Sequence, residues 1–431
     1  MTMVNAYSKA DAAKLDARTR SMIARRDRAL GPAYRLFYER PLEFVRGEGV
    51  FLYDQSGDAY LDAYNNVASV GHCHPRIVAA INEQAARLNT HTRYIHESVL
   101  DYAERLLAKL GEPLSHVMFT CTGSEANDIA LRIAQTYTGG EGVVVTQNAY
   151  HGTTQAVAAL SPSLGEFVTI GEQVRLVPPP RDANDGGRAF AASVRAAFDD
   201  LAASGVRPSA LLVDTIFSSD GVFTDPPGFL TPAVDAAHAA GAMFIADEVQ
   251  PGFARMGDEF WGYRRHGLAP DLVTMGKPMG NGHPIAAVAA RADVLEPFGR
   301  QCRYFNTFGG NPVSCAAGMA VLDVIEDEAL QANAMRTGAL LGAALNNLRR
   351  RFPVLAEVRG AGLFYGVDVA APDGDGAVLA ARIVNALRER RVLISATGLR
   401  GDVLKIRPPL VFSPSNVDQF ATTLEGVLTS L

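Results

Sequence analysis

The stretch "GAMFIADEVQ", residues 241–250, joins a continuous apolar run to two carboxylates and a glutamine. An apolar run without alternation predicts a strand that is buried on both faces of its sheet. Similar runs lie at 117–120, 142–146, 210–215, 271–276 and 285–290. Segments with a helical period lie between them, at 124–136, 188–203 and 230–240. The sequence therefore predicts an α/β domain with a mostly parallel sheet that helices cover on both faces.

The two ends of the chain have a different pattern. Residues 1–45 are charged and helix-prone, and residues 49–66 predict two strands across a turn at Ser56, Gly57 and Asp58. From about residue 312, long helices and a few strands predict a smaller α+β domain. We expect an amino-terminal arm with part of the small domain at 1–60, a large ligand-binding domain at 61–311, and the carboxyl-terminal small domain at 312–431.

Length and charge exclude several classes of function. The 431 residues suffice for a large buried core, and the net charge of −6 provides no basic field for nucleic acid or anionic lipid. No apolar run is long enough for a membrane span, so we expect a cytoplasmic protein. The four cysteines lack C-x-x-C spacing, so they predict buried small hydrophobic residues, with no zinc or other metal site and no disulfide.

One lysine has an unusual position. The 40 basic residues include only five lysines, at 9, 14, 109, 277 and 405. Lys277, in "LVTMGKPMGNG", directly follows a strand of the buried type, and parallel sheets bind ligands outside the carboxyl ends of their strands. An amine in such partly apolar surroundings has a lowered pKa and is nucleophilic. From this stretch alone, an ordinary solvated loop lysine is an equally open interpretation.

The carboxylates of the opening stretch have two interpretations as well. Asp247 and Glu248 are adjacent on a strand, so only one of them can point into a site at the strand end. A carboxylate there can pair with a protonated ring nitrogen, as pyridoxal phosphate requires to withdraw electrons. Alternatively, both acids cap the next helix.

Three further segments predict binding of an anion and a flat ring. In "CTGSEAN", a strand leads through Thr122, Gly123 and Ser124 into a helix whose first N–H groups favour an anion. A simple capped helix explains the same residues. Tyr150, in "NAYHG", can stack on a ring or be an ordinary loop aromatic, and Thr307 before two glycines offers another hydroxyl.

Taken in order, these segments resemble the class III pyridoxal-phosphate-dependent aminotransferases from about residue 47 to about residue 413. The likeness is carried by "YLDAYNNVASVGHCHP", "CTGSEAND", "YHG", "ADEVQPGFARMG", "MGKPMGNG", "NTFGGNP" and "VLKIRPPL". The resemblance implies fold type I and a homodimer with shared active sites. It also implies pyridoxal 5′-phosphate as cofactor, Lys277 as the catalytic Schiff-base lysine and Asp247 as the partner of the ring nitrogen. The implied cofactor contacts are Thr122, Gly123, Ser124, Tyr150, His151, Asp247, Gln250, Lys277 and, from the partner subunit, the residue equivalent to Thr307.

The substrate side departs from the family's pattern. The glutamate- and ornithine-type members have an arginine three residues before the "PP" and a glutamate that gates it. Here these positions are Lys405 and Ser219. An ammonium cannot hold a carboxylate in the bidentate manner of a guanidinium. Three arginines are candidates for the substrate's carboxylate instead: Arg93, Arg400 and Arg407.

The likeness is greatest to mitochondrial-type alanine–glyoxylate aminotransferases and to ethanolamine-phosphate phospholyases, through residues 65–75, 88–97 and 403–409. We expect a transaminase that moves an amino group from a small amino acid or amine to an oxo acid such as pyruvate or glyoxylate. The alternative enzyme is a phospholyase that eliminates phosphate from phosphoethanolamine-like amines. A catalytically silent binding protein is a third hypothesis, against which the set Lys277, Asp247 and Gln250 argues.

Overall fold

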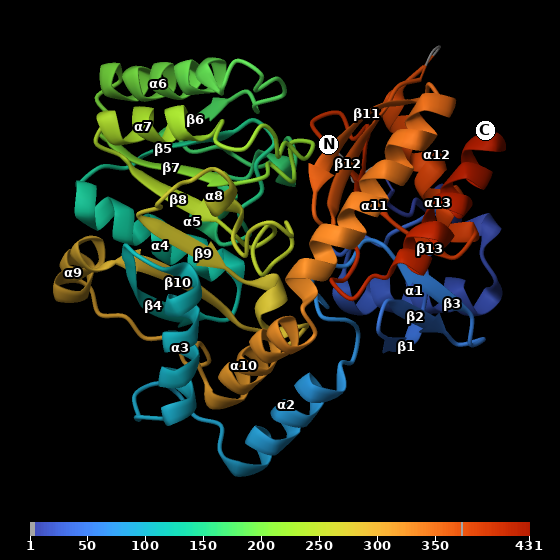
Figure 1. The fold of residues 1–431 in the computed structure, drawn as a ribbon, viewed down its shortest axis with the longest axis horizontal. Helices are drawn as coiled ribbons and strands as arrows, with labels where there is room; N and C mark the ends of the chain where they lie inside the picture. Colours follow the sequence, from blue (N-terminus) through green and yellow to red (C-terminus); the bar gives the residue numbers. More distant parts are fainter. Residues whose placement is uncertain (1–4, 372–373) are drawn as a thin grey trace.

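The computed structural model describes residues 5–371 and 374–431. Figure 1 shows a larger body built on one central sheet and a smaller body that contains both the first strands of the chain and its carboxyl-terminal helices. The chain therefore leaves the small body, builds the large one and returns. The domain boundaries at residues 60 and 311 stay a prediction.

The central sheet has seven strands in the order β4-β10-β9-β8-β7-β5-β6. Their bounds are β4 Leu114–Thr120, β5 Gly142–Thr146, β6 Val174–Val177, β7 Pro208–Asp214, β8 Met243–Asp247, β9 Leu272–Met275 and β10 Ala286–Arg291. The run β9-β8-β7-β5-β6 is parallel, which confirms the mostly parallel sheet. Strand β10 is antiparallel to both β9 and β4. It reverses because a short loop with no crossover helix connects it to β9.

Helices cover this sheet on both faces. Helix α4 (Gly123–Thr138) packs with alternate strand residues such as Val145, Leu212 and Ile245. Helices α6 (Arg188–Ala203) and α7 (Thr231–Ala239) pack with the intervening residues on the other face, and Figure 1 shows these two helices together at one side of the sheet. Since successive strand residues point to opposite faces, continuous apolar runs are what this arrangement requires.

The small body contains two four-stranded sheets, in the orders β1-β2-β3-β13 and β11-β12-β15-β14. Strand β13 pairs in parallel with β3, which joins the two ends of the chain. The bounds of the first sheet are β1 Phe44–Glu48, β2 Phe51–Asp54, β3 Ala59–Asp62 and β13 Val392–Leu393. Those of the second are β11 Leu355–Ala361, β12 Phe364–Val369, β14 Ser395–Thr397 and β15 Val403–Ile406. The remaining helices here are α11 Leu330–Arg351, α12 Gly376–Glu389 and α13 Pro414–Thr429.

Three helices of intermediate length lie at the bottom and centre of Figure 1: α2 Pro75–Arg87, α3 Glu97–Leu110 and α10 Pro312–Asp327. Shorter helices are α5 Gln155–Ala158, α8 Gly262–Arg265, α9 Ala292–Gln301 and the 3-10 turns η1 Lys9–Lys14, η2 Pro162–Leu164 and η3 Lys277–Gly280. In the residues described, no helix is long and apolar enough to cross a membrane. The expectation that all four cysteines are buried is wrong, because Cys73 is exposed and only Cys315 is fully buried.

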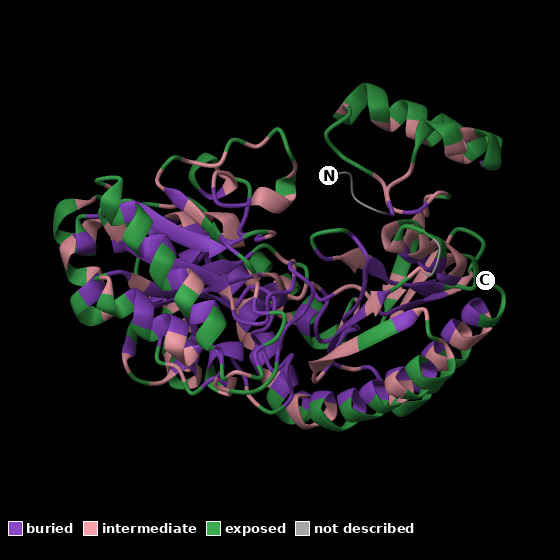
Figure 2. Cartoon of the chain, turned by 90° about the horizontal axis from the view of Figure 1, so that it is seen from above, coloured by how far each residue is buried: buried purple, intermediate pink, exposed green. Residues whose placement is uncertain are grey.

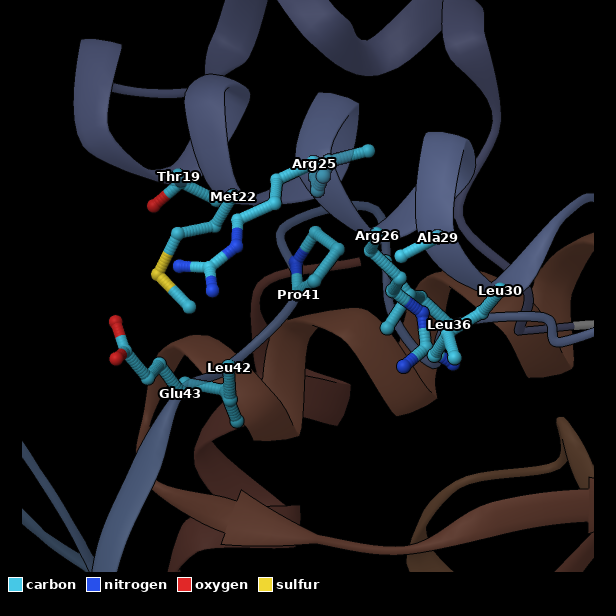
Figure 3. Close-up of a pocket in the computed structure, with 11 residues that line it drawn as sticks. Thr19, Met22, Arg25, Arg26, Ala29, Leu30, Leu36, Pro41, Leu42 and Glu43 are labelled. Carbon is cyan, nitrogen blue, oxygen red and sulfur yellow. The ribbon is translucent and has the colours of Figure 1, made fainter.

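The amino-terminal helix α1 (Ala17–Leu30) contains no buried residue. Figure 2 shows it standing away from the rest of the small body. Figure 3 shows the open space beneath it, with Met22 on one side and Pro41 and Leu42 on the other. The segments before and after this helix are joined to each other, since the backbone N–H of Tyr38 donates to the carbonyl of Asn5 over 2.6 Å.

Candidate active site

A cavity lies at the carboxyl ends of the central parallel strands β7, β8 and β9, where the sheet topology predicts a ligand. It brings together seven residues predicted from the sequence and three that were not. The predicted ones are Gly123, Ser124, Tyr150, His151, Asp247, Gln250 and Lys277, and the others are Gly152, Asp214 and Val249.

Lys277 begins the 3-10 turn η3, two residues after strand β9 ends. Its backbone has a φ of 25°, close to the left-handed region that residues with a side chain seldom adopt. Burial, followed by the positive charge of Arg407, lowers the pKa of its ammonium to about 8, although Asp247 and Asp214 oppose this shift. At pH 7 about a tenth of the population is therefore a neutral, nucleophilic amine, far more than for a solvated lysine.

Asp247, the last residue of β8, and Glu248, which follows it, point in different directions. Asp247 lines the cavity, and its Oδ2 accepts hydrogen bonds from His151 Nδ1 at 2.7 Å and Asn127 Nδ2 at 3.0 Å. Glu248 lies on the far side and accepts from the backbone N–H groups of Gly262 and Tyr263, which begin α8. The capping interpretation thus holds for Glu248, and the pairing of Asp247 with a ring nitrogen stays a prediction.

Burial raises the pKa of Glu248 to about 7, although its three hydrogen-bond donors oppose the shift. The third donor is the hydroxyl of Thr215, at 2.8 Å. Glu248 is completely buried, so it is a structural cap and does not reach the cavity.

The start of helix α4 forms the second wall of the cavity. Thr122 is the N-cap and accepts the N–H of Glu125, whose carboxylate in turn accepts the N–H of Thr122. The capped-helix interpretation is therefore correct, but the next two N–H groups, of Gly123 and Ser124, lack intrahelical acceptors and border the cavity. Thr122 itself is exposed and does not line the cavity.

Close packing around this wall requires glycine at residue 152. A Cβ on Gly152 would lie 2.5 Å from Ser124 Oγ, and its φ of 143° also disfavours a side chain. The Ser124 hydroxyl accepts the backbone N–H of Thr153 at 3.1 Å, which ties the "YHG" loop to the helix start. Tyr150 and His151 are thereby placed over the cavity and beside Asp247.

Asp214 is a cavity residue that the sequence analysis missed. Its two carboxylate oxygens accept the backbone N–H groups of Ile216 and Ser218, so it shapes the loop after β7. Burial first, and then the charge of Asp247, raise its pKa. Asp214 is the last residue of β7 and the register partner of Asp247, the last residue of β8. A carboxylate at the end of a buried strand was the sequence signal that could have identified it.

Two basic residues of the small body lie beyond Gln250. Lys405 is in strand β15, and Arg407 directly follows that strand. Arg407 donates through Nη1 to Gln250 Oε1, and its guanidinium lies 4.4 Å from the ring centroid of Tyr64. Lys405 Nζ lies 5.6 Å from the ring centroid of Phe364. Burial, and then Arg407, lower the pKa of Lys405 well below its ordinary value. Within residues 5–371 and 374–431, neither cation has a carboxylate in ion-pairing contact.

Besides Thr122, three predicted residues lie outside the cavity lining. The Arg93 guanidinium stacks 3.7 Å from the ring centroid of Phe305, in a separate groove. Arg400 is three-quarters exposed and pairs with Asp402 at 2.6 Å. Thr307 is exposed on the loop before α10. Their assigned roles stay predictions.

The family model for Aminotransferase class-III matches residues 38–428 of this chain. The chain belongs to this family. It is an enzyme of the class, with the fold of type I, and pyridoxal phosphate is the family's cofactor. The resemblance found in the sequence is therefore confirmed.

Among curated relatives, the chain is 38% identical to an alanine–glyoxylate aminotransferase 2-like protein of Drosophila melanogaster, over 94% of this chain and 86% of that protein. It is 34% identical to an ethanolamine-phosphate phospho-lyase homolog of Caenorhabditis elegans, over 99% of each. Among solved structures, it is similar to an Arthrobacter phospholyase in complex with phosphoethanolamine. The TM-score is 0.91 and the identity 43%, over 95% of this chain and 100% of that one.

The cavity of this class III enzyme fits pyridoxal phosphate. Gly123 and Ser124 would hold the phosphate through their free N–H groups, Asp247 would pair with the ring nitrogen, and Lys277 would supply the amine for the aldehyde. When bound, the cofactor withdraws electrons from the substrate's Cα–H bond and makes that proton acidic. In its neutral form, Lys277 Nζ can accept that proton. Tyr150 can cover the ring face and restrict water.

Proposed function

We propose that this enzyme eliminates phosphate from a small phosphorylated amine of the phosphoethanolamine type. The observation that carries the proposal is the pair of buried cations, Lys405 and Arg407, at the edge of the cofactor cavity. Each is only 7% exposed. Burial disfavours the ammonium form of Lys405, and neither side chain has a carboxylate in ion-pairing contact among the described residues, so an incoming anion would stabilise that ammonium and pair with the Arg407 guanidinium.

The number of charges favours phosphate over carboxylate. A phosphate monoester carries close to two negative charges at neutral pH, whereas a carboxylate carries one. Two neighbouring cations are therefore compensated by one phosphate group, and Lys405 and Arg407 each provide several N–H donors for its oxygens. A gating carboxylate would compete with the substrate for these cations. Ser219, which stands at that position in our alignment, carries no charge and leaves them available.

The relatives support the same proposal. The Arthrobacter structure, at 43% identity, is named a phospholyase and contains phosphoethanolamine. The phospho-lyase homolog of Caenorhabditis elegans matches this chain from end to end. Overall, phosphoethanolamine and water would give acetaldehyde, ammonia and inorganic phosphate. The Cβ–O bond breaks and phosphate leaves with its electron pair, so the reaction consumes no oxidant and no amino acceptor.

The transaminase favoured by the sequence is the second candidate. It rests on the 38% identity to the alanine–glyoxylate aminotransferase 2-like protein and on the catalytic set itself, which both reactions share. In that reaction, a small amino acid or amine donates the amino group and an oxo acid such as pyruvate or glyoxylate accepts it. Arg407 would then hold the substrate's carboxylate.

We also propose a homodimer in which Thr307 of each chain serves the partner's site, as the family resemblance implies. The exposed position of Thr307, next to the exposed aromatic Phe308, supports this arrangement. We also propose a cytoplasmic location, although three of the relatives are named mitochondrial.

One assay separates the two reactions. The purified enzyme is incubated with phosphoethanolamine and no oxo acid, and inorganic phosphate and acetaldehyde are measured over time. We expect both products in equal amounts. Absence of phosphate release, together with exchange between alanine and glyoxylate, would instead establish the transaminase. The Lys277→Ala variant is the control for phosphate released without the enzyme's amine.

A further inference from the structure

A buried amide joins three separate elements behind the cavity. Asn127, in the second turn of α4, is 1% exposed and donates through Nδ2 to Asp247 Oδ2 at 3.0 Å and to the carbonyl of His151 at 2.7 Å. Its Oδ1 accepts the hydroxyl of Thr274, on β9, at 2.7 Å. Neither Asn127 nor Thr274 lines the cavity itself.

The chemistry of these partners permits only one orientation of the amide. A backbone carbonyl and a carboxylate accept hydrogen bonds, so the NH₂ group of Asn127 must face His151 and Asp247. The oxygen must then face Thr274, whose hydroxyl donates to it. If the Thr274 hydroxyl is removed, the amide loses the contact that holds its oxygen on that side.

The strand register explains why Thr274 is available for this contact. Thr274 is the register partner of Asp247 across the parallel pair β8 and β9. The same strand β9 ends just before Lys277. A polar chain, Thr274–Asn127–Asp247–His151, therefore runs from the lysine's own strand to the carboxylate that faces the cavity.

His151 ends this chain. Its Nδ1 lies 2.7 Å from Asp247 Oδ2, so this nitrogen carries the proton. Its Nε2 is buried and has no partner among the described residues. His151 and Asn127 thus both donate to Asp247 Oδ2. The other oxygen, Oδ1, accepts no side-chain donor among the described residues and is held by the backbone N–H of Val249 at 3.1 Å.

We propose that Asn127 and Thr274 are positioning residues, which hold the Asp247 carboxylate in the orientation that binds the ring nitrogen of the cofactor. This proposal depends on the cofactor and not on whether the enzyme is a phospholyase or a transaminase. Because both residues act through Asp247, their loss should weaken the hold on the cofactor more than it weakens the fold.

The test is Thr274→Val, which keeps the shape of the side chain and removes its hydroxyl. The melting temperature is measured with and without bound pyridoxal phosphate, and the rate of cofactor loss is followed by visible absorbance after dilution. A purely structural Thr274 would lower both melting temperatures equally. We expect the difference between them to shrink, and cofactor loss to become about fivefold faster, as the loss of one hydrogen bond predicts.

Two variants serve as controls. Thr274→Ser restores a hydroxyl and should return both the rate and the melting difference toward those of the wild type. Thr138→Val removes another buried hydroxyl of α4, whose partners Ala134, Gly140 and Ser209 do not line the cavity, and should leave the cofactor-loss rate unchanged. Equal drops in both melting temperatures of Thr274→Val, with a wild-type rate of cofactor loss, would overturn the proposal.

Discussion

The two sides of the active-site cavity differ in how their charges are paired. On the cofactor side, Asp247 accepts three hydrogen bonds from within the chain, and those from His151 and Asn127 come from other elements. On the substrate side, Lys405 and Arg407 are equally buried but have no carboxylate partner in residues 5–371 and 374–431. The carboxylate of the cofactor side is thus held by the folded chain itself, whereas the cations of the substrate side have no counter-charge in contact with them among the described residues.

This difference separates what the fold needs from what the reaction needs. A satisfied polar network adds rigidity, whereas unpaired buried cations lower the stability of the folded protein. Such a cost is typical of functional sites, where activity and stability oppose each other. Variants on the cofactor side should therefore lose function and stability together. Variants on the substrate side should lose function but gain stability.

The largest effect is expected for Lys277→Ala, on the cofactor side. It removes both the amine that holds the cofactor and the base near the substrate's Cα, so turnover should fall by at least about 10³-fold. Phosphate release measures the loss, and the cofactor's visible absorbance should disappear on dialysis. Lys109→Ala, which removes a lysine that pairs with Glu326 on the surface, is the matched control and should keep full activity. Turnover above a tenth of the wild type in Lys277→Ala would refute the assignment.

The second prediction is that a variant on the substrate side loses activity but gains stability. Lys405→Met keeps the length of the side chain and removes its charge. The kcat/KM for phosphoethanolamine should fall about 10²-fold, since truncating one member of a buried charge contact commonly costs 2–5 kcal/mol. The free energy of unfolding of the cofactor-free protein should rise, because an apolar side chain replaces a buried amine whose ammonium form burial disfavours. Denaturant titration checks the stability. A variant that loses both activity and stability would contradict the distinction between the two sides.

The third prediction connects the two sides through pH. Only the neutral amine of Lys277 attacks the cofactor's aldehyde, and its pKa is about 8. The rate at which cofactor-free protein recombines with pyridoxal phosphate should therefore rise with pH up to about 8 and level off above it. The Arg407 charge helps to lower this pKa, so Arg407→Met should move the midpoint upward. At pH 7 the rate then falls about tenfold for each pH unit of that shift.

Absorbance at a series of pH values measures both midpoints. Identical midpoints in Arg407→Met and the wild type would show that Arg407 does not act on Lys277 through its charge.

Much of the cofactor side was predictable from the sequence because it follows local rules. A buried strand appears in the sequence as a continuous apolar run, and functional residues lie at or just after the end of such a run. Asp247 is the last residue of β8, and Lys277 lies two residues after the end of β9. Alternation along the strand also predicted that only one of Asp247 and Glu248 faces the site, although it could not identify which one. The antiparallel direction of β10 was missed, because a loop length and not the strand's own composition determines it.

The substrate side was less predictable because its residues converge only through tertiary contacts. Nothing in "VLKIRPPL" shows that Arg407 reaches Gln250, which is 157 residues away in the sequence. Asn127 and Thr274 were missed for a similar reason, since a buried amide and a strand threonine carry no motif of their own. Among thirty-five arginines, the sequence could not separate those that face the cavity from those on the surface.

The smallest effect is expected for Arg400→Ala, which tests whether Arg400 is a surface arginine or one that holds the substrate. Arg400 was a candidate for holding the substrate, but its side chain is three-quarters exposed and its charge is paired with Asp402. An exposed ion pair is worth about 0–1 kcal/mol, so both stability and kcat/KM should change by no more than a few-fold. Steady-state kinetics beside Lys405→Met gives the comparison. A loss as large as that of Lys405→Met would mean that the loop after β14 moves toward the substrate during turnover, and the substrate side would then include a third cation.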